Sequence, residues 1–170
     1  MLEEAMGTKL TKCVACGFAG PLETASEDES VTVGGHTFTG AVPAERCPQC
    51  GETYTDAEGH RALALSVARA LIEAGEVSGG VFRFFRHSLG LTGAALAGLL
   101  GVAPDTVSRW ERGERDVDRL AWATVAGLIL DEIKEGPRMR DVLEAMRTPG
   151  PPLAKAVRLG GHGKRAQTTG

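Results

Sequence analysis

Four cysteines, arranged as two C-x-x-C pairs, constrain the fold of this 170-residue chain more than any other feature of its sequence. Thirty residues separate the two pairs, and a glycine directly follows each one, Gly17 and Gly51. Two residues between thiols let both sulfurs of a tight turn point at one centre, and two such turns can close a tetrahedral site around zinc. A glycine tolerates the positive φ that the end of each turn needs. The sequence therefore predicts one structural Zn²⁺ with the ligands Cys13, Cys16, Cys47 and Cys50.

The same cysteines allow other chemistry. A disulfide pair would need an oxidising compartment, and the start Met1-Leu2-Glu3-Glu4 has neither the basic nor the apolar region of a secretory signal. A redox-active dithiol usually has one C-x-x-C at a strand-to-helix junction rather than two matched turns. Catalytic zinc needs an open coordination position, which four thiolates do not leave. We therefore favour structural zinc over a dithiol redox protein, and we expect a cytoplasmic protein.

Between the two cysteine pairs the chain has the pattern of a β-hairpin. The stretch Val31–Thr39 alternates apolar and polar residues around Gly34-Gly35. Residues 27–29, all acidic, are interpreted as a solvated loop. His36 is a further possible zinc ligand, but four thiolates already satisfy the ion, so an exposed histidine at the turn is expected. Residues 1–54 are thus expected to form a small zinc ribbon, a β-hairpin with two zinc knuckles, whose core depends on the metal.

A helix is expected to connect this ribbon to the rest of the chain, over residues 55–78. Thr55 and Glu58 match a capping box at its start, apolar residues recur at helical spacing, and Gly75 marks its end. Packing of this helix against one lobe is the favoured interpretation, with a spacer or a dimer contact as the alternative. Ser78-Gly79-Gly80 then predicts a flexible hinge.

Three short helices follow, with the spacing of a helix-turn-helix. They are expected near residues 82–90, 93–100 and 104–112, where glycines, a capping threonine and a proline mark their ends. Two helices that cross through a turn of about four residues need a small residue at their contact and a glycine in the turn. Ala97 and Gly101 meet these two needs.

The third of these helices has an outer face that suits the major groove of DNA. Val107 and Trp110 lie three residues apart and are expected to point inward, which leaves the polar side chains outside. An arginine there can donate two hydrogen bonds to guanine, and hydroxyls and further arginines can hold phosphates. The alternative is an α-hairpin of a helical bundle, in which Arg109 only pairs with Asp105. We favour DNA binding, with the candidate contacts Arg109, Thr106, Ser108, Arg112, Asp105, Thr92 and Arg86.

Charge is distributed unevenly along the chain. Residues 1–78 hold twelve acidic against five basic residues, a net charge of −7, whereas the rest of the chain has a net charge of +4. A basic half suits a nucleic-acid partner. Helices expected at 120–133 and from Pro137 complete a domain of residues 79–147, and residues 148–170 are expected to be a disordered basic tail. No apolar run reaches the ~18 residues of a membrane span, so no membrane partner is expected.

The order of these parts, together with their motifs, resembles the MqsA-type antitoxins, which carry a YgiT-type zinc finger. The motifs are Cys-Val-Ala-Cys, Cys-Pro-Gln-Cys-Gly-Glu and the sequence Ser-Arg-Trp-Glu-Arg-Gly of residues 108–113. The last is typical of the Cro/CI (XRE) class of helix-turn-helix proteins. The resemblance covers roughly residues 10–133. Gly93 stands where the class often has glutamine, and Asp105 stands where the family has a recognition asparagine.

This resemblance implies that the zinc lobe binds a small RNase toxin, while the C-terminal lobe dimerises and represses the shared operon, with Arg109 reading DNA. The net charge of −7 on residues 1–78 agrees with such a partner, because a protein that binds RNA tends to be basic. We therefore expect an α+β protein of two lobes, a zinc ribbon followed by an all-α helix-turn-helix domain. We expect no enzyme but a homodimeric repressor that binds double-stranded operator DNA and a small basic toxin. The alternative is a stand-alone regulator without a toxin partner.

Overall fold

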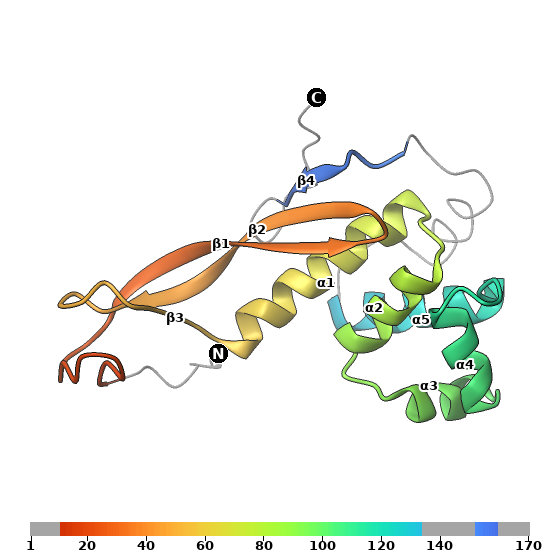
Figure 1. Ribbon diagram of the computed structural model, residues 1–170, viewed down its shortest axis with the longest axis horizontal. Helices are drawn as coiled ribbons and strands as arrows, with labels where there is room; N and C mark the ends of the chain where they lie inside the picture. Colours follow the sequence, from red (N-terminus) through yellow and green to blue (C-terminus); the bar gives the residue numbers. More distant parts are fainter. Residues whose placement is uncertain (1–10, 134–151, 160–170) are drawn as a thin grey trace, which may run out of the picture.

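A long β-hairpin occupies one side of the molecule (Figure 1). The computed structural model describes residues 11–133 and 152–159. The hairpin turns at Gly34 and Gly35, whose φ angles of 61° and 80° lie in the left-handed region that glycine tolerates, so the predicted turn is confirmed. Its two long strands pair antiparallel, and a short third strand pairs with the far end of the second. The strands are β1 (Glu23–Val33), β2 (His36–Arg46) and β3 (Thr53–Thr55).

The hairpin packs on the first helix, α1 (Ala57–Ala74). Along β2, Phe38 and Val42 are fully buried while the residues between the buried positions are more exposed, so one face of the sheet belongs to the core. The helix approaches closely because Gly40 leaves room for Leu63: a Cβ on this glycine would lie 2.7 Å from the Leu63 side chain. The expected helix between the ribbon and the helix-turn-helix therefore packs on the sheet.

Four more helices follow, and local signals set most of their ends. Asp56, Ser78 and Thr92 cap the first three helices of the chain, each accepting a hydrogen bond from a backbone N–H of the first turn. Gly75 and Gly101 end α1 and α3 with φ of 68° and 66°. The helices expected from the sequence are thus confirmed in this part of the chain. They are α2 (Gly79–Ser88), α3 (Gly93–Leu100), α4 (Pro104–Glu111) and α5 (Arg119–Ile133).

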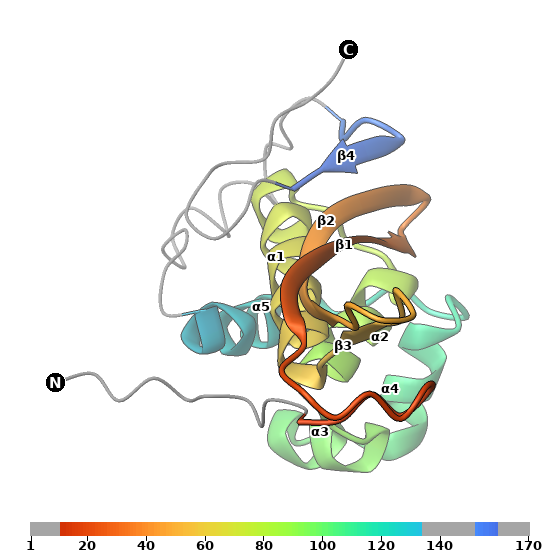
Figure 2. The ribbon, with the colours of Figure 1, turned by 90° about the vertical axis from the view of Figure 1, so that its left-hand side faces the viewer.

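One hydrophobic core runs through the hairpin and the helices. Phe38 of β2, Leu71 of α1, Phe82 of α2 and Trp122 of α5 are fully buried and belong to the same cluster. The first helix contacts β2 as well as α2 and α5, and Figures 1 and 2 show it beside the hairpin with the other helices below. The α+β class, a hairpin before a five-helix domain, is confirmed. The two expected lobes share this core.

Three local predictions are wrong. Ser78-Gly79-Gly80 is not a flexible hinge but the cap and first turn of α2, where Gly79 lies so close to α4 that a Cβ would be 2.1 Å from a carbonyl oxygen. Residues 27–29 are not a loop but continue β1, because their pairing with β2 is unbroken. His36 is not an exposed turn residue: its side chain is 14% exposed, and its Nδ1 lies 2.9 Å from the carbonyl oxygen of Ala154.

The C-terminal part of the chain returns to the hairpin. β4 (Ala156–Arg158) lies parallel to β2, and Val157, beside Phe38, is only 4% exposed. The expected disorder of residues 148–170 is therefore wrong for this strand, because Val157 covers apolar surface of the hairpin and its backbone finds partners there. The helix expected from Pro137 lies outside the described residues.

Candidate metal centre and nucleic-acid interface

The four cysteines meet at the end of the hairpin opposite its turn. Their sulfur atoms all lie within 4.8 Å of one another, with 3.6 Å between Cys13 and Cys50 and 3.7 Å between Cys16 and Cys47. A tetrahedral site with Zn–S bonds of about 2.3 Å places its sulfurs roughly 3.8 Å apart, so the thiols already have the spacing of such a site. None of the four forms a disulfide. The sequence prediction of a four-cysteine cluster able to hold a metal ion is confirmed.

Two turns of the same backbone geometry present these sulfurs. The N–H of Cys13 donates to the carbonyl five residues later at 2.9 Å, and the N–H of Cys47 does the same at 2.8 Å. The following glycines, Gly17 and Gly51, donate back to the carbonyls of these cysteines at 3.0 and 2.9 Å, each with φ of 78°. The glycine after each cysteine pair therefore has the positive φ that the sequence implies, and the two turns form a matched pair of knuckles.

Tyr54 on β3 completes the first knuckle, and the sequence analysis missed it. Its hydroxyl lies 3.2 Å from the sulfur of Cys13 and accepts hydrogen bonds from the backbone N–H groups of Val14 and Ala15, at 3.1 and 3.2 Å. This hydroxyl, aided by the N–H of Cys16, stabilises the thiolate and lowers the pKa of Cys13 to about 6. The available signal was that the one tyrosine of the chain follows the second cysteine pair closely.

The pKa values of Cys16 and Cys50 are raised instead. The N–H of Glu52 lowers the pKa of Cys50, but burial and the hydrogen bonds from Cys16 and the other thiols outweigh it and raise the pKa to about 12. Four thiolates this close repel one another, so the cluster as a whole favours a bound cation that neutralises them. The donor set and its spacing therefore fit a metal ion.

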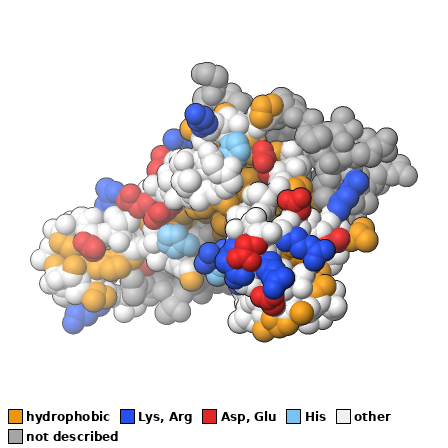
Figure 3. Space-filling view, turned by 45° about the vertical axis from the view of Figure 1, so that its right-hand side comes forward, with side chains coloured by type: hydrophobic (Ala, Val, Ile, Leu, Met, Phe, Trp, Pro, Cys, Tyr) orange, Lys and Arg blue, Asp and Glu red, His pale blue; other side chains and the backbone are white. Residues whose placement is uncertain are grey.

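Helices α3 and α4 form the predicted helix-turn-helix. Ala97, Val107 and Trp110 are at most 4% exposed, and the turn between the helices begins at Gly101. The ring of Trp110 packs edge-on against Phe82 of α2, with 5.8 Å between ring centres. The inward orientation expected for Val107 and Trp110 is thereby confirmed. Figure 3 shows Lys and Arg side chains gathered with acidic ones on one face of the helical part.

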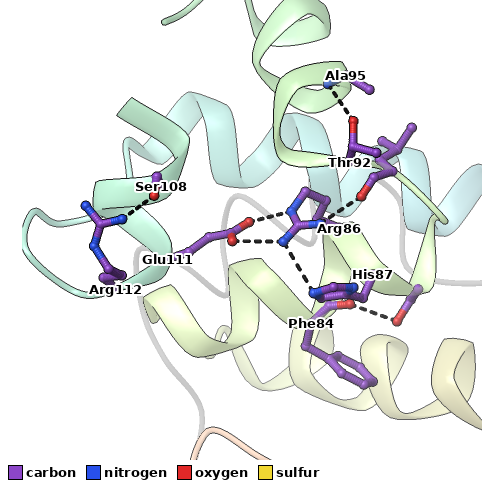
Figure 4. Close-up of polar contacts among 10 residues, drawn as sticks. Phe84, Arg86, His87, Thr92, Ala95, Ser108, Glu111 and Arg112 are labelled. Carbon is purple, nitrogen blue, oxygen red and sulfur yellow. Dashed lines mark hydrogen bonds and ion pairs between the residues drawn. The ribbon is translucent and has the colours of Figure 1, made fainter. Parts of the chain in front are cut away.

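The sequence predicts a phosphate contact for Arg86, but the structure gives this residue a different role. Its side chain is 10% exposed, and Nε and Nη2 donate to the carboxylate of Glu111 at 2.6 and 2.9 Å (Figure 4). Its Nη1 donates to the carbonyl of Leu91 at 2.8 Å. The hydrogen bonds to Glu111 raise the pKa of Arg86, which stays charged. Arg86 thus ties α2 to the end of α4, because the packing of the helices turns it inward.

The other candidate residues of α4 are more exposed, and several are paired with one another. The Nε of Arg109 lies 2.9 Å from the carboxylate of Asp105, and the two side chains are 58% and 63% exposed. Arg112 donates to the carboxylate of Glu114. It also donates to the hydroxyl of Ser108 (Figure 4). The ion pair between Arg109 and Asp105, which the alternative interpretation as an α-hairpin of a helical bundle predicts, is present. It leaves Arg109 at the surface.

The two threonines have different surroundings. Thr92 caps α3, where its hydroxyl accepts a hydrogen bond from the N–H of Ala95 at 3.1 Å (Figure 4). Thr106 is half-buried and lines a groove that also borders α3 and α5. Six of the seven candidates are thus at least partly exposed on α4, on the turn after it or at the start of α3, and Arg86 is the exception.

A family model covers most of the described chain. Residues 11–131 match the model described as the antitoxin component of bacterial toxin-antitoxin system, MqsA. The chain belongs to the MqsA antitoxin family. This membership confirms the resemblance inferred from the motifs, and with it that the protein is an antitoxin rather than an enzyme. A search of the curated proteins gave no match.

The match covers some of the features described above and not others. It includes the four cysteines, Tyr54 and the helix-turn-helix, but it ends before β4. The strand that covers the hairpin near Phe38 therefore lies outside the matched region. Among the residues that the structure describes, no helix is both long and apolar enough to span a membrane.

Proposed function

We propose that this antitoxin binds operator DNA through α4, as a homodimer, and represses the operon that it shares with an RNase-type toxin. The observation that carries the proposal is the orientation of α4. Val107 and Trp110 anchor its inner side, while Asp105 and Arg109 face solvent on its outer side. A short helix held in this way fits the major groove. Arg109 is the proposed base contact, and the further proposed contacts to bases or phosphates are Ser108, Arg112 and Thr92. Thr106 instead lines the groove that is proposed below to bind a second copy.

We further propose that the metal is zinc and that its role is structural. Four cysteine thiolates are a donor set that structural zinc sites use, and they leave no position for a reacting water. The cysteine end of the hairpin has little apolar material to hold it together, since Val14 of the first knuckle is 79% exposed. A bound ion would supply the positive charge that holds the four thiolates and would cross-link the two knuckles.

A second copy of the chain is proposed to pack on the helical part. Leu99 and Leu120 are 65% and 73% exposed, and with Leu100 and Trp110 they line a groove of about 440 Å³. A contiguous exposed apolar patch around this groove would favour association with a second copy. Two copies would present two α4 helices, which suits an operator with two half-sites.

The toxin is proposed to bind the hairpin part, in the cytoplasm. Residues 1–78 carry a net charge of −7, and Asp28 and Glu29 belong to β1. A basic protein that holds RNA would be attracted to this surface. The absence of disulfides among the four cysteines agrees with a reducing compartment.

Binding to the DNA upstream of the gene tests the proposal. Arg109→Ala is expected to cost about 1–3 kcal/mol of specific binding and to narrow the difference between operator and random DNA. Arg69→Ala is the matched control, because Arg69 forms the same kind of ion pair with Glu73, at 3.0 Å, on α1. If the Arg109→Ala protein distinguishes operator from random DNA as well as the wild-type protein does, the outer face of α4 is not the proposed interface.

A further inference from the structure

The two arginines near the outer side of α4 differ in which of their donors are free. Arg112 uses Nε and Nη2 on the carboxylate of Glu114, at 2.6 and 3.1 Å, and Nη1 on the hydroxyl of Ser108. Arg109 forms an ion pair with Asp105, in which its Nε lies 2.9 Å from Oδ2. Among residues 11–133 and 152–159, no group accepts from Nη1 or Nη2 of Arg109, so both terminal nitrogens are free to donate.

The ion pair with Asp105 restricts how Arg109 can donate. The two residues are four apart on α4, which places their side chains next to each other on one face of the helix. A carboxylate beside Nε attracts the side-on edge of the guanidinium, which carries Nε, toward Asp105. The end-on pair, Nη1 with Nη2, stays free, and two N–H donors side by side match O6 and N7 of guanine.

We propose that Asp105 sets the base specificity of α4 by orienting Arg109, so that the end of its guanidinium reads a guanine in each half-site. This inference rests on the proposed DNA binding by α4. Guanine presents two adjacent acceptors in the major groove, whereas adenine presents an acceptor beside a donor. A guanidinium has donors only, and it therefore forms two hydrogen bonds with guanine but one with adenine.

The carboxylate of Asp105 also prevents this residue from recognising adenine with two hydrogen bonds. An asparagine at this position could bond both N6 and N7 of adenine, because its amide carries a donor and an acceptor, whereas a carboxylate only accepts. The negative charge is tolerated at this position because Asp105 lies in the first turn of α4, at the positive end of the helix dipole. Asp105 is thus a positioning residue, and Arg109 makes the contact with the base.

Selection from double-stranded oligonucleotides with randomised half-sites tests this inference on the full chain. The wild-type protein is expected to enrich guanine at one position of each half-site. Asp105→Asn is expected to reduce the preference for guanine at that position about 10-fold. Its binding to random DNA is expected to stay equal or to strengthen, because a charge that repels phosphates is lost. In an Arg109→Ala background, Asp105→Asn is expected to change the preference no further.

Asp116→Asn is the matched control, because it removes the same charge from an exposed residue in the turn after α4. It is expected to leave the guanine preference intact. If Asp105→Asn weakens binding to all sequences equally, or leaves the guanine preference unchanged, Asp105 does not act through Arg109 and this inference is overturned while DNA binding stands. If the wild-type protein selects no sequence, the proposed function and this inference are both overturned.

Discussion

The hydroxyl of Tyr54 connects three atoms of the first knuckle although it is not one of the four candidate ligands. It touches the sulfur of Cys13 and accepts hydrogen bonds from two backbone N–H groups of the same turn. A group in this position fixes the direction of the sulfur and favours its thiolate form, whose pKa is lowered to about 6. One thiol of the cluster is therefore prepared for a metal by a residue on a different strand.

Removing this hydroxyl is expected to weaken the metal site. Tyr54→Phe should lower the affinity for zinc by about 10- to 100-fold, because the support of a ligand by its neighbours typically has this effect. Competition with a chromophoric chelator measures the affinity. Thr53→Val, on the same strand, is the control, since its hydroxyl reaches only the carbonyl of Gly51, at 3.5 Å. Equal affinities of the wild-type and Tyr54→Phe proteins would show that the hydroxyl does not support the site.

How well a single residue can be predicted from sequence depends on how local its chemistry is. The cysteine spacing is sufficient to name the cluster, because two residues between thiols direct both sulfurs to one centre. The spacing around Arg86 is not sufficient. An arginine on a short helix is expected at the surface until the end of another helix, carrying Glu111, packs against it. Tyr54 was missed for the same reason, since the turn that it supports lies about forty residues earlier.

Among the secondary-structure elements, α2 and α4 meet more closely than a side chain would allow. Gly79 begins α2, and a Cβ on it would lie 2.1 Å from the carbonyl oxygen of Trp110 and 3.1 Å from that of Glu111. Both of these oxygens belong to the last turn of α4. Because α4 carries the proposed DNA-reading face, this backbone contact helps to set its orientation.

Two neighbouring glycines allow a matched test of this contact. Gly79→Ala is expected to destabilise the protein by roughly 1–3 kcal/mol, because the backbone of α4 must move to admit a methyl group. Gly80→Ala is the control: nothing lies within 4 Å of its Cβ, and alanine should be neutral or stabilise the helix by up to about 1 kcal/mol. Denaturant unfolding measures both variants. Equal stabilities of the two would contradict the close packing of α2 on α4.

The elements that could be predicted are those whose ends carry their own signals. Thr92 and Gly101 bracket α3, and the structure has the helix between them. The strand β4 has no such signal, because a partner more than a hundred residues earlier in the chain fixes it. The stretch Ser78-Gly79-Gly80 fails differently. Glycines favour flexibility in isolation, but here α4 packs so closely against Gly79 that there is no room for a side chain.

The whole molecule has one core with two exposed ends. In Figure 1 the cysteine end of the hairpin and helix α4 lie on opposite sides of the molecule. The core between them takes in the turn end of the hairpin and the helices, including Phe38 and Val42 of β2. The cysteine cluster therefore lies in the part of the hairpin that the core does not reach, where a bound metal is proposed to stabilise it.

Removal of the metal is expected to loosen this end alone. A chelator should release the two knuckles while the helices and the turn end of the hairpin stay folded, because their apolar contacts do not involve the cluster. Hydrogen exchange should speed up at residues 13–17 and 47–51 and stay unchanged in α4. Cys47→Ser is expected to give the same pattern. Loss of the helical circular dichroism signal on chelation would show instead that the metal supports the whole fold.

The antitoxin is proposed to use its two ends for two tasks, the hairpin for the toxin and α4 for the operator. The most direct test measures the growth of cells that express the small reading frame next to this gene, alone and together with this chain. The expected result is toxicity alone, rescue by the wild-type chain and by Arg109→Ala, and loss of rescue with Cys47→Ser. A neighbour that is not toxic, or toxicity that the wild-type chain does not relieve, would contradict the account.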